Sequence, residues 1–229
     1  MLLAPYAVGL GLAGHLTWTH LTLLAFWLVG YFAFFATGLW LKARRRPRYW
    51  PPVPVYMPAA ALLGGATLAL DPGLIRWAPA FFVPLTVGLY ASATRDERSL
   101  WSGLSTSVGA CLMTPVVVDT GGGPEHGWGP TWWATAALMA YFAGTVLYVK
   151  TMIRERGERA YLVLSLGFHA VATLAALVAP APRHLLVAGL LALATVRAAV
   201  LPRYRLTPAV VGIVEIVFTL ALVATLVIG

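Results

Sequence analysis

The chain has 229 residues, of which 60% are apolar and only 10% are charged. A soluble domain carries about 25% charged residues, so a water-soluble enzyme or binding domain is excluded. The net charge of +8 does not indicate nucleic-acid binding, because the basic residues stand beside long apolar segments, where they set membrane topology and attract anionic lipid. Backbone groups in lipid must be satisfied within the protein, and unbroken apolar runs exclude the alternating pattern of a barrel. We therefore predict an all-α, polytopic transmembrane helical bundle that forms a single domain over residues 1–229.

Apolar runs between polar breaks predict about nine membrane spans. A helix needs roughly 20 apolar residues, and at least about 17, to cross the hydrocarbon core. The first run is short and has neither a charged flank nor a signal-peptide pattern, so we expect a span that has lost its upstream flank. The eighth carries Arg197 near its end. In chain order the predicted spans are Leu2–Gly14, Leu21–Leu41, Val53–Leu70, Trp77–Ala93, Leu100–Val118, Thr131–Val149, Ala160–Val178, Leu185–Leu201 and Ala209–Ile228.

The charges between these spans predict the orientation. Of the sixteen basic residues, all except Arg76 and Arg183 lie in or beside the loops after the second, fourth, sixth and eighth spans. Positive residues in short loops stay in the cytoplasm. We therefore expect a multi-pass protein of the cell (inner) membrane, with its N-terminus in the cytoplasm and its C-terminus outside. The cytoplasmic loops would be those at 42–50, 94–99, 150–159 and 202–207.

Two segments four spans apart have similar sequences. Residues 31–42 run from Tyr-Phe-Ala to a lysine before an arginine-rich loop, and residues 141–150 do the same with two residues fewer. Transporters contain parallel internal repeats of this kind. Either an internal repeat or a chance match between two segments built from few residue types would explain the similarity.

The basic segments resemble the YwiC-like family of bacterial integral membrane proteins. The resemblance is carried by Lys42–Tyr49, Arg95–Leu100, Gly144–Gly157 and Leu206–Pro208, together with Glu215, and it spans most of the chain. Members of that family usually carry a His-Gly-Ala-Trp stretch just before the first helix, which is absent here, as a misplaced start or a truncation would explain. The resemblance implies a family without an established biochemical activity.

A more distant resemblance is to the UbiA-type intramembrane prenyltransferases. These also have nine helices, an inside N-terminus and functional loops after helices two and six. Their aspartate-rich loops hold Mg²⁺ against a diphosphate, and Mg²⁺ is bound through carboxylates and phosphates. Here the first loop has no acid, and the other has only Glu155 and Glu158 among four basic residues. We therefore expect no Mg²⁺ and no other cofactor, even where the architecture is shared.

The candidate ligand-binding residues lie in the loops that we expect in the cytoplasm. Arginine offers a bidentate fork to a phosphate or carboxylate. Topology alone, or salt bridges between adjacent loops, would explain the same residues without a ligand. The candidates are Lys42, Arg44, Arg45, Arg46, Arg95, Asp96, Glu97, Arg98, Lys150, Arg154, Glu155 and Arg156.

Three ionisable candidates lie inside predicted spans. Glu215 lies well within the last one, where a charge is costly and usually faces a partner or a cavity. We expect that it does not face lipid, and that Arg197, or failing that Arg203, pairs with it, either structurally or as part of a site. His169 is either a proton relay or ligand, or a residue that hydrogen-bonds to another helix.

The outer segment 119–130 is rich in glycine. It contains His126 with Asp119 and Glu125, which make a weak set of metal ligands, so we expect a solvated loop and no metal site. The lone Cys111 excludes an internal disulfide and a cysteine metal cluster.

Two classes of function remain. The first is a non-enzymatic membrane protein whose cytoplasm-facing basic cavity binds or moves an anionic or lipid-like ligand, or which transports a small solute. The second is a UbiA-like prenyltransferase with a degenerate phosphate site. The scarcity of acids favours the first, with membrane lipids and an anionic or isoprenoid-like molecule as partners and no nucleic acid. The sequence identifies no protein partner. We expect spans two to seven to wrap the cavity, with Lys42 and Lys150 at its mouth.

Overall fold

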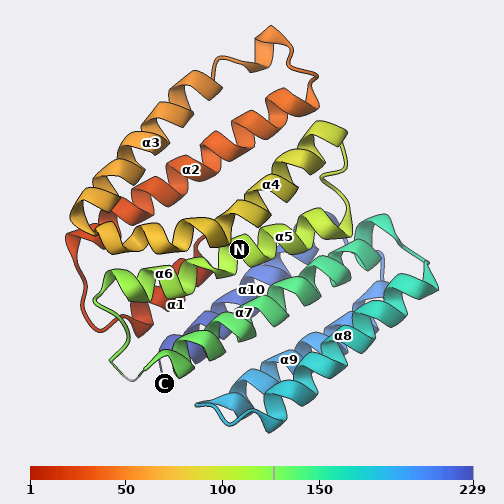
Figure 1. Ribbon diagram of the computed structural model, residues 1–229. Helices are drawn as coiled ribbons and strands as arrows, with labels where there is room; N and C mark the ends of the chain where they lie inside the picture. The colour runs from red at the N-terminus through yellow and green to blue at the C-terminus, as the bar shows by residue number, and fades with distance from the viewer. Residues whose placement is uncertain (126, 229) are drawn as a thin grey trace.

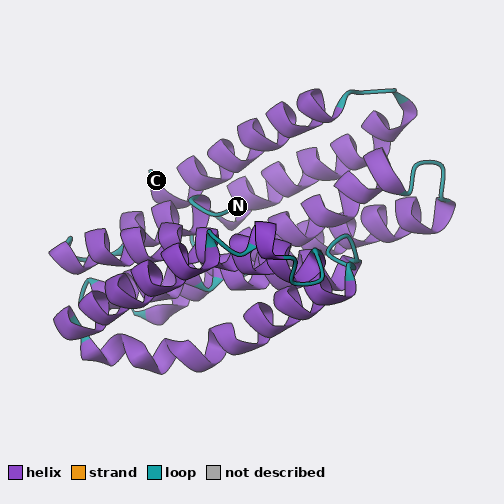
Figure 2. Ribbon diagram, turned by 90° about the horizontal axis from the view of Figure 1, so that it is seen from above, coloured by secondary structure: helices purple, strands orange, loops and turns teal. Residues whose placement is uncertain are grey.

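The computed structural model describes residues 1–125 and 127–228, and the regular elements in these residues are helices (Figures 1 and 2). His126, expected in a solvated loop, lies outside the described residues. Short turns η1 (Pro47–Tyr49), η2 (Pro72–Trp77), η3 (Lys150–Arg154) and η4 (Leu201–Arg203) adjoin the helices. The helices are α1 (Ala4–Leu12), α2 (Trp18–Lys42), α3 (Val53–Leu70), α4 (Ala78–Thr94), α5 (Leu100–Cys111), α6 (Met113–Thr120), α7 (Trp128–Val149), α8 (Arg159–Val178), α9 (His184–Val200) and α10 (Pro208–Val227).

Eight helical segments in the described residues are long and apolar enough to cross a membrane, with α5 and α6 together forming one of them. This confirms the predicted multi-pass helical bundle. The first predicted span is shorter than the run Leu2–Gly14 indicated, because α1 has 9 residues. That length is about 13 Å of helix at 1.5 Å per residue, less than half of the roughly 30 Å hydrocarbon core.

The fifth predicted span is divided by a proline. Pro115 follows Cys111 by four positions, so it has no N–H to donate to the Cys111 carbonyl, and its ring crowds that carbonyl. Helix α5 accordingly ends at Cys111 and α6 begins at Met113, with Leu112 between them. The apolar run alone had predicted one continuous helix.

Asp119 corrects the interpretation of segment 119–130 as a solvated loop. It belongs to α6, and only 8% of its surface is exposed. The Arg76 guanidinium donates to both carboxylate oxygens, with Nε 3.0 Å from Oδ2, and the Trp77 indole donates to Oδ2 at 2.8 Å. A buried carboxylate needs such partners. Asp119 therefore ties η2 to α6.

Two helical hairpins, α2–α3 and α8–α9, lie on either side of the other helices (Figure 1). Helix α2 packs against α3 and α4. The chain of contacts then continues from α4 to α5, from α5 to α7 and from α7 to α8, and α8 pairs with α9. Helix α1 lies against α6 and α10. The most buried spans are α5–α6 and α7, whereas α3 and α8 keep most of their residues exposed. Exposed apolar helices of this kind are expected to face lipid.

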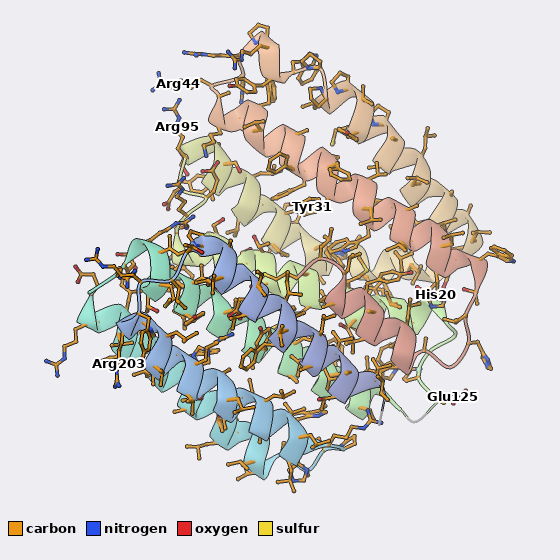
Figure 3. All side chains as sticks on the ribbon, turned by 180° about the vertical axis from the view of Figure 1, so that it is seen from behind. His20, Tyr31, Arg44, Arg95, Glu125 and Arg203 are labelled. Carbon is orange, nitrogen blue, oxygen red and sulfur yellow. The ribbon has the colours of Figure 1, made fainter. Side chains whose placement is uncertain are left out.

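The four basic loops meet at one end of the bundle. Figure 3 shows Arg44, Arg95 and Arg203 along one end of the molecule, while His20 and Glu125 lie at the opposite end. Contacts join neighbouring loops in series: Lys42 Nζ to Glu97 Oε2 at 3.1 Å, Lys150 Nζ to the Arg98 carbonyl at 3.1 Å, and Arg156 Nη2 to the Tyr204 carbonyl at 2.7 Å. The prediction that these loops share one face is confirmed, and we call this face the basic end.

Candidate functional site

The loop after α2 presents an arginine cluster to solvent. Its members are Arg44, Arg45, Arg46 and Arg48, all exposed, and we call them the arginine loop. None of them forms an ion pair with an acid in the described part of the chain. Arg45 lies over the Trp40 ring at 5.8 Å, and Arg48 lies over the Tyr49 ring at 4.8 Å. The loop therefore carries positive charge that no neighbouring acid offsets.

The turn geometry of this loop displays the arginines. Arg44 and Arg45 have φ values of 55° and 58°, in the left-handed region that L-residues with a side chain adopt uncommonly. The two residues reverse the chain between α2 and η1. Trp40 and Trp50 then lie with ring centres 4.8 Å apart, which closes the base of the loop with the kind of amphipathic ring that favours a membrane interface.

An aromatic groove lies on the flank of α2 and α3. Its volume is about 390 Å³. Tyr31 stacks on Phe35, and Phe32 stacks on Tyr56 across the two helices. Tyr31, Phe32 and Phe35 are about half exposed, as are side chains that face lipid. The groove is lined by Tyr31, Phe32, Phe35, Leu39, Pro52 and Tyr56.

The loop after α4 binds to the end of α2. Besides the pair between Lys42 and Glu97, Arg95 Nε donates to the Lys42 carbonyl at 3.1 Å. Arg95 ends α4 in a left-handed conformation, with φ at 62°. Asp96 follows it, and its backbone N–H is 2.7 Å from the Ala91 carbonyl. Arg95 and Glu97 therefore link this loop to the end of α2, and the pair between Lys42 and Glu97 is a salt bridge of the kind expected between adjacent loops.

A basic pocket of about 260 Å³ lies between α5 and the end of α7. The Lys150 side chain is only 9% exposed, and its Nζ lies 3.7 Å from Glu155 as well as next to the Arg98 carbonyl. Arg154 also reaches that carbonyl, at 3.4 Å. Residues 150–154 form a π-helical turn, a feature frequent at functional sites. Residues that line the pocket include Met1, Glu97, Arg98, Thr145, Lys150 and Arg154.

The residues expected at one cavity mouth do not share one hollow. Lys150, Arg98 and Arg154 line the basic pocket. Lys42 does not line it, but pairs with Glu97 at its edge. The arginine loop lines neither hollow, and it joins α2 to α3, whose residues line the aromatic groove.

The intramembrane pair lies between α7, α9 and α10. Glu215 Oε1 accepts from Arg197 Nη1, and its Oε2 accepts from Tyr141 Oη at 2.9 Å and from Thr145 Oγ1 at 2.8 Å. The expected partnership of Glu215 with Arg197 is confirmed, without recourse to Arg203. A charge placed in this region of a membrane needs such partners.

Aromatic rings surround the arginine of this pair. The Arg197 Cζ atom lies 4.3 Å from the centre of the Tyr148 ring and 4.8 Å from that of Phe218. A guanidinium is attracted to the ring faces, more strongly where water is excluded. Arg197 itself is 5% exposed.

His169 packs beside this pair. Its Nδ1 lies 2.7 Å from the Ser165 carbonyl one turn earlier in α8, and its ring rests on Gly144 of α7. The sequence had placed His169, Arg197 and Glu215 in the membrane but had missed their tyrosine and threonine neighbours. The spacing of Tyr141, Thr145 and Tyr148, which places them on one helix face, was the available signal. We call Tyr141, Thr145, Tyr148, His169, Arg197 and Glu215 the polar centre.

Comparisons with known proteins give the chain its relatives. Residues 1–118 match the family model described as YwiC-like protein. An uncharacterized protein of Haemophilus influenzae is 28% identical over 238 residues, which cover 99% of this chain and 94% of the relative. The uncharacterized protein YwiC of Bacillus subtilis is 28% identical over 171 residues, which cover 74% of this chain and 70% of that protein. No solved structure matches, and the distant resemblance to UbiA-type enzymes stays a prediction.

Proposed function

The chain belongs to the YwiC-like family, and for this member we propose binding of a phosphate-bearing, long-chain amphiphile at the basic end. The arginine loop would hold the phosphate, and the aromatic groove would hold the apolar chain. The observation that carries the proposal is an adjacency along the chain: the arginine loop joins α2 to α3, and the aromatic groove on these two helices is lined by Leu39 and Pro52, which stand on either side of the loop.

The charge of the arginine loop supports a phosphate ligand. Arginine keeps its charge at every physiological pH, and its planar fork matches phosphate oxygens. Lys42 has a carboxylate partner, whereas Arg44 and Arg46 have neither an acid nor an aromatic ring among the contacts of the described residues. Arg44 and Arg46 are therefore the side chains best placed to bind an incoming anion.

The groove supports an apolar chain attached to that phosphate. From Tyr31 to Leu39 it extends about 12 Å along α2, at 1.5 Å per residue. Its rings are wide, flat and apolar, and an apolar chain can pack against them through close dispersion contacts. If the positive loops are cytoplasmic, as short basic loops generally are, the ligand comes from the cytoplasmic leaflet.

The acids of the basic end support binding that is independent of metal. Glu97 is paired with Lys42, and Glu155 lies beside Lys150. A diphosphate-bound Mg²⁺ needs carboxylate ligands, and cations around it would repel it. The proposal is therefore a binding or carrier function, and the prenyltransferase is its alternative.

Titration of the full chain in nanodiscs tests this function. The probes are farnesyl diphosphate and phosphatidylglycerol, which separate an isoprenoid from a phospholipid source, with phosphatidylcholine as the zwitterionic control. We expect binding by one of the anionic probes that persists in EDTA and weakens as salt rises. The double variant R44Q/R46Q should bind about tenfold more weakly, which corresponds to about 1.4 kcal/mol.

Matched variants separate this site from general basicity. R203Q/R205Q removes two exposed arginines from the same end and should leave the affinity unchanged. F35A in the groove should weaken binding, whereas F82A, at another exposed phenylalanine on α4, should not. Strict dependence on Mg²⁺ would restore the transferase, and equal binding to phosphatidylcholine would refute the phosphate site.

A further inference from the structure

We propose that the polar centre is a second binding site, which takes a small carboxylate anion together with a proton. It lies among α7–α10, apart from the arginine loop, and concerns a small solute instead of a lipid. The proposal therefore does not depend on the function proposed above. Four observations support the proposal: the free edge of Arg197, the unpaired polar atoms near this arginine, the basic pocket that reaches them, and the net charge of the polar centre.

Arg197 has a free edge shaped for a carboxylate. Its Nη1 binds Glu215, but its Nε and Nη2 are buried and have no hydrogen-bond partner among the described residues. These two nitrogens lie on the same side of the guanidinium and present parallel N–H groups, the arrangement that binds a carboxylate through both oxygens. Unpaired donors are costly in a membrane interior, so this edge favours an acceptor ligand.

Two further polar atoms from other helices lack partners. They are Tyr148 Oη of α7 and His169 Nε2 of α8, both buried. Gly144 and Tyr148 are four residues apart and so share one face of α7. The His169 ring rests on this face, because a Cβ on Gly144 would come within 2.9 Å of Nε2, and the Tyr148 ring packs on Arg197. The unpaired atoms of α7, α8 and α9 thus belong to one neighbourhood.

The basic pocket reaches this neighbourhood. Thr145 lines the pocket, and its hydroxyl donates to Glu215. Only one side chain therefore separates the pocket from the ion pair. Arg98, Lys150 and Arg154 line the same pocket and raise the local concentration of anions. Farther along, α7, α9 and α10 pack Leu138, Leu191 and Leu222 into an apolar core, so the basic pocket is the side of entry.

The charge of the centre requires that a proton accompany the anion. Arg197 and Glu215 already neutralise each other, so an added anion would leave one uncompensated negative charge in a medium of low dielectric. The charged groups that act on His169 are Arg197 and Glu215.

His169 is arranged to take that proton. Its Nδ1 contacts the Ser165 carbonyl, which can only accept, so Nδ1 carries the hydrogen and Nε2 is the free basic nitrogen. A proton on Nε2 restores neutrality and creates another N–H donor for the anion. The anion and the proton both enter from the pocket, no bond is broken, and the net charge of the centre is unchanged.

Calorimetry with formate, the smallest carboxylate, tests the proposal on the full chain in nanodiscs. Measurements in two buffers with different ionisation enthalpies should show uptake of about one proton per formate, with an affinity that weakens about tenfold per pH unit once His169 is neutral. H169Q should lose both the proton uptake and the pH dependence. H184Q, at the opposite end of the bundle, should keep both.

Two variants test the free edge of Arg197. R197K keeps a cation for Glu215 but removes the pair of parallel donors, and formate affinity should fall at least about tenfold. Y148F removes one polar atom and should weaken binding less. Thermal unfolding reports whether each variant is folded, and if R197K is not, H169Q and Y148F decide. No binding of formate, binding without proton uptake, or unchanged binding by H169Q would overturn the proposal, while lipid binding at the arginine loop would be unaffected.

Discussion

Residues 31–42 of α2 and residues 141–150, which end α7 and begin η3, have similar sequences and opposite surroundings. Tyr31 and Phe32 are 44% and 48% exposed, whereas Tyr141 and Phe142 are 4% and 1% exposed. The first pair lines the aromatic groove, and Tyr141 binds the Glu215 carboxylate. The same residue types thus serve a lipid-facing groove in one helix and a buried polar centre in the other.

The difference comes from the neighbours of the two helices. Helix α2 packs mainly against α3 and α4, touches α6, and leaves much of its surface to lipid, while α7 is surrounded by α1, α5, α6, α8, α9 and α10. A phenol in lipid is tolerated near polar groups, and one in a packed interior needs a hydrogen-bond partner. Both segments end in a lysine at the basic end. Their origin in an internal repeat stays a prediction.

The largest effect is expected from removing the charge of Arg197, which lies in the polar centre beside α7. R197M leaves Glu215 without its counter-charge and should lower the free energy of unfolding by about 3–5 kcal/mol, as for other broken buried pairs. The double variant R197M/E215L should recover most of this loss. R203M, in an exposed loop, is the control. Reversible unfolding in mixed micelles measures all three, and equal stability of R197M and R203M would contradict a buried pair.

A smaller effect is expected from adding a methyl group at one glycine in each of the two helices. G144A would place a Cβ 2.9 Å from His169 Nε2, and overpacking of this kind costs about 1–3 kcal/mol. Gly30, next to Tyr31 in α2, has nothing within 4 Å of its Cβ position. G30A should therefore be neutral or stabilising, by up to about 1 kcal/mol, because alanine favours the helix. The same unfolding assay compares them, and the reverse order would refute the packing of His169 on α7.

The smallest effect compares the two tyrosines directly. Y141F removes a hydrogen bond to Glu215 but leaves that of Thr145, and hydrogen bonds between membrane helices average about 0.6 kcal/mol with a maximum near 1.7. Y31F should change the unfolding free energy by less than about 0.6 kcal/mol, because Tyr31 is half exposed in the groove. Stability curves of both variants would show it. Equal losses would indicate that Tyr31 has a buried partner in the membrane.

Much of the fold followed from the sequence. The length and hydropathy of the apolar runs predicted the helical segments, since an apolar run of sufficient length is stable in lipid as a helix. The basic residues predicted which loops lie together, and the depth of Glu215 predicted a partner that proved to be Arg197. The α1 segment was predicted too long, and the break at Leu112 followed from Pro115 only once the helix ends were known.

The sequence by itself determined the class of protein, the order of its spans and the clustering of its basic loops. Only the tertiary structure decided which apolar faces meet. In water, the hydrophobic side of a helix is the buried side, but in a membrane the faces toward lipid and toward protein are equally apolar. Periodicity therefore could not separate Tyr31 from Tyr141, place Asp119 in a buried pair, or assemble the polar centre. Those outcomes depend on hydrogen bonds and close packing between helices that are distant in the chain.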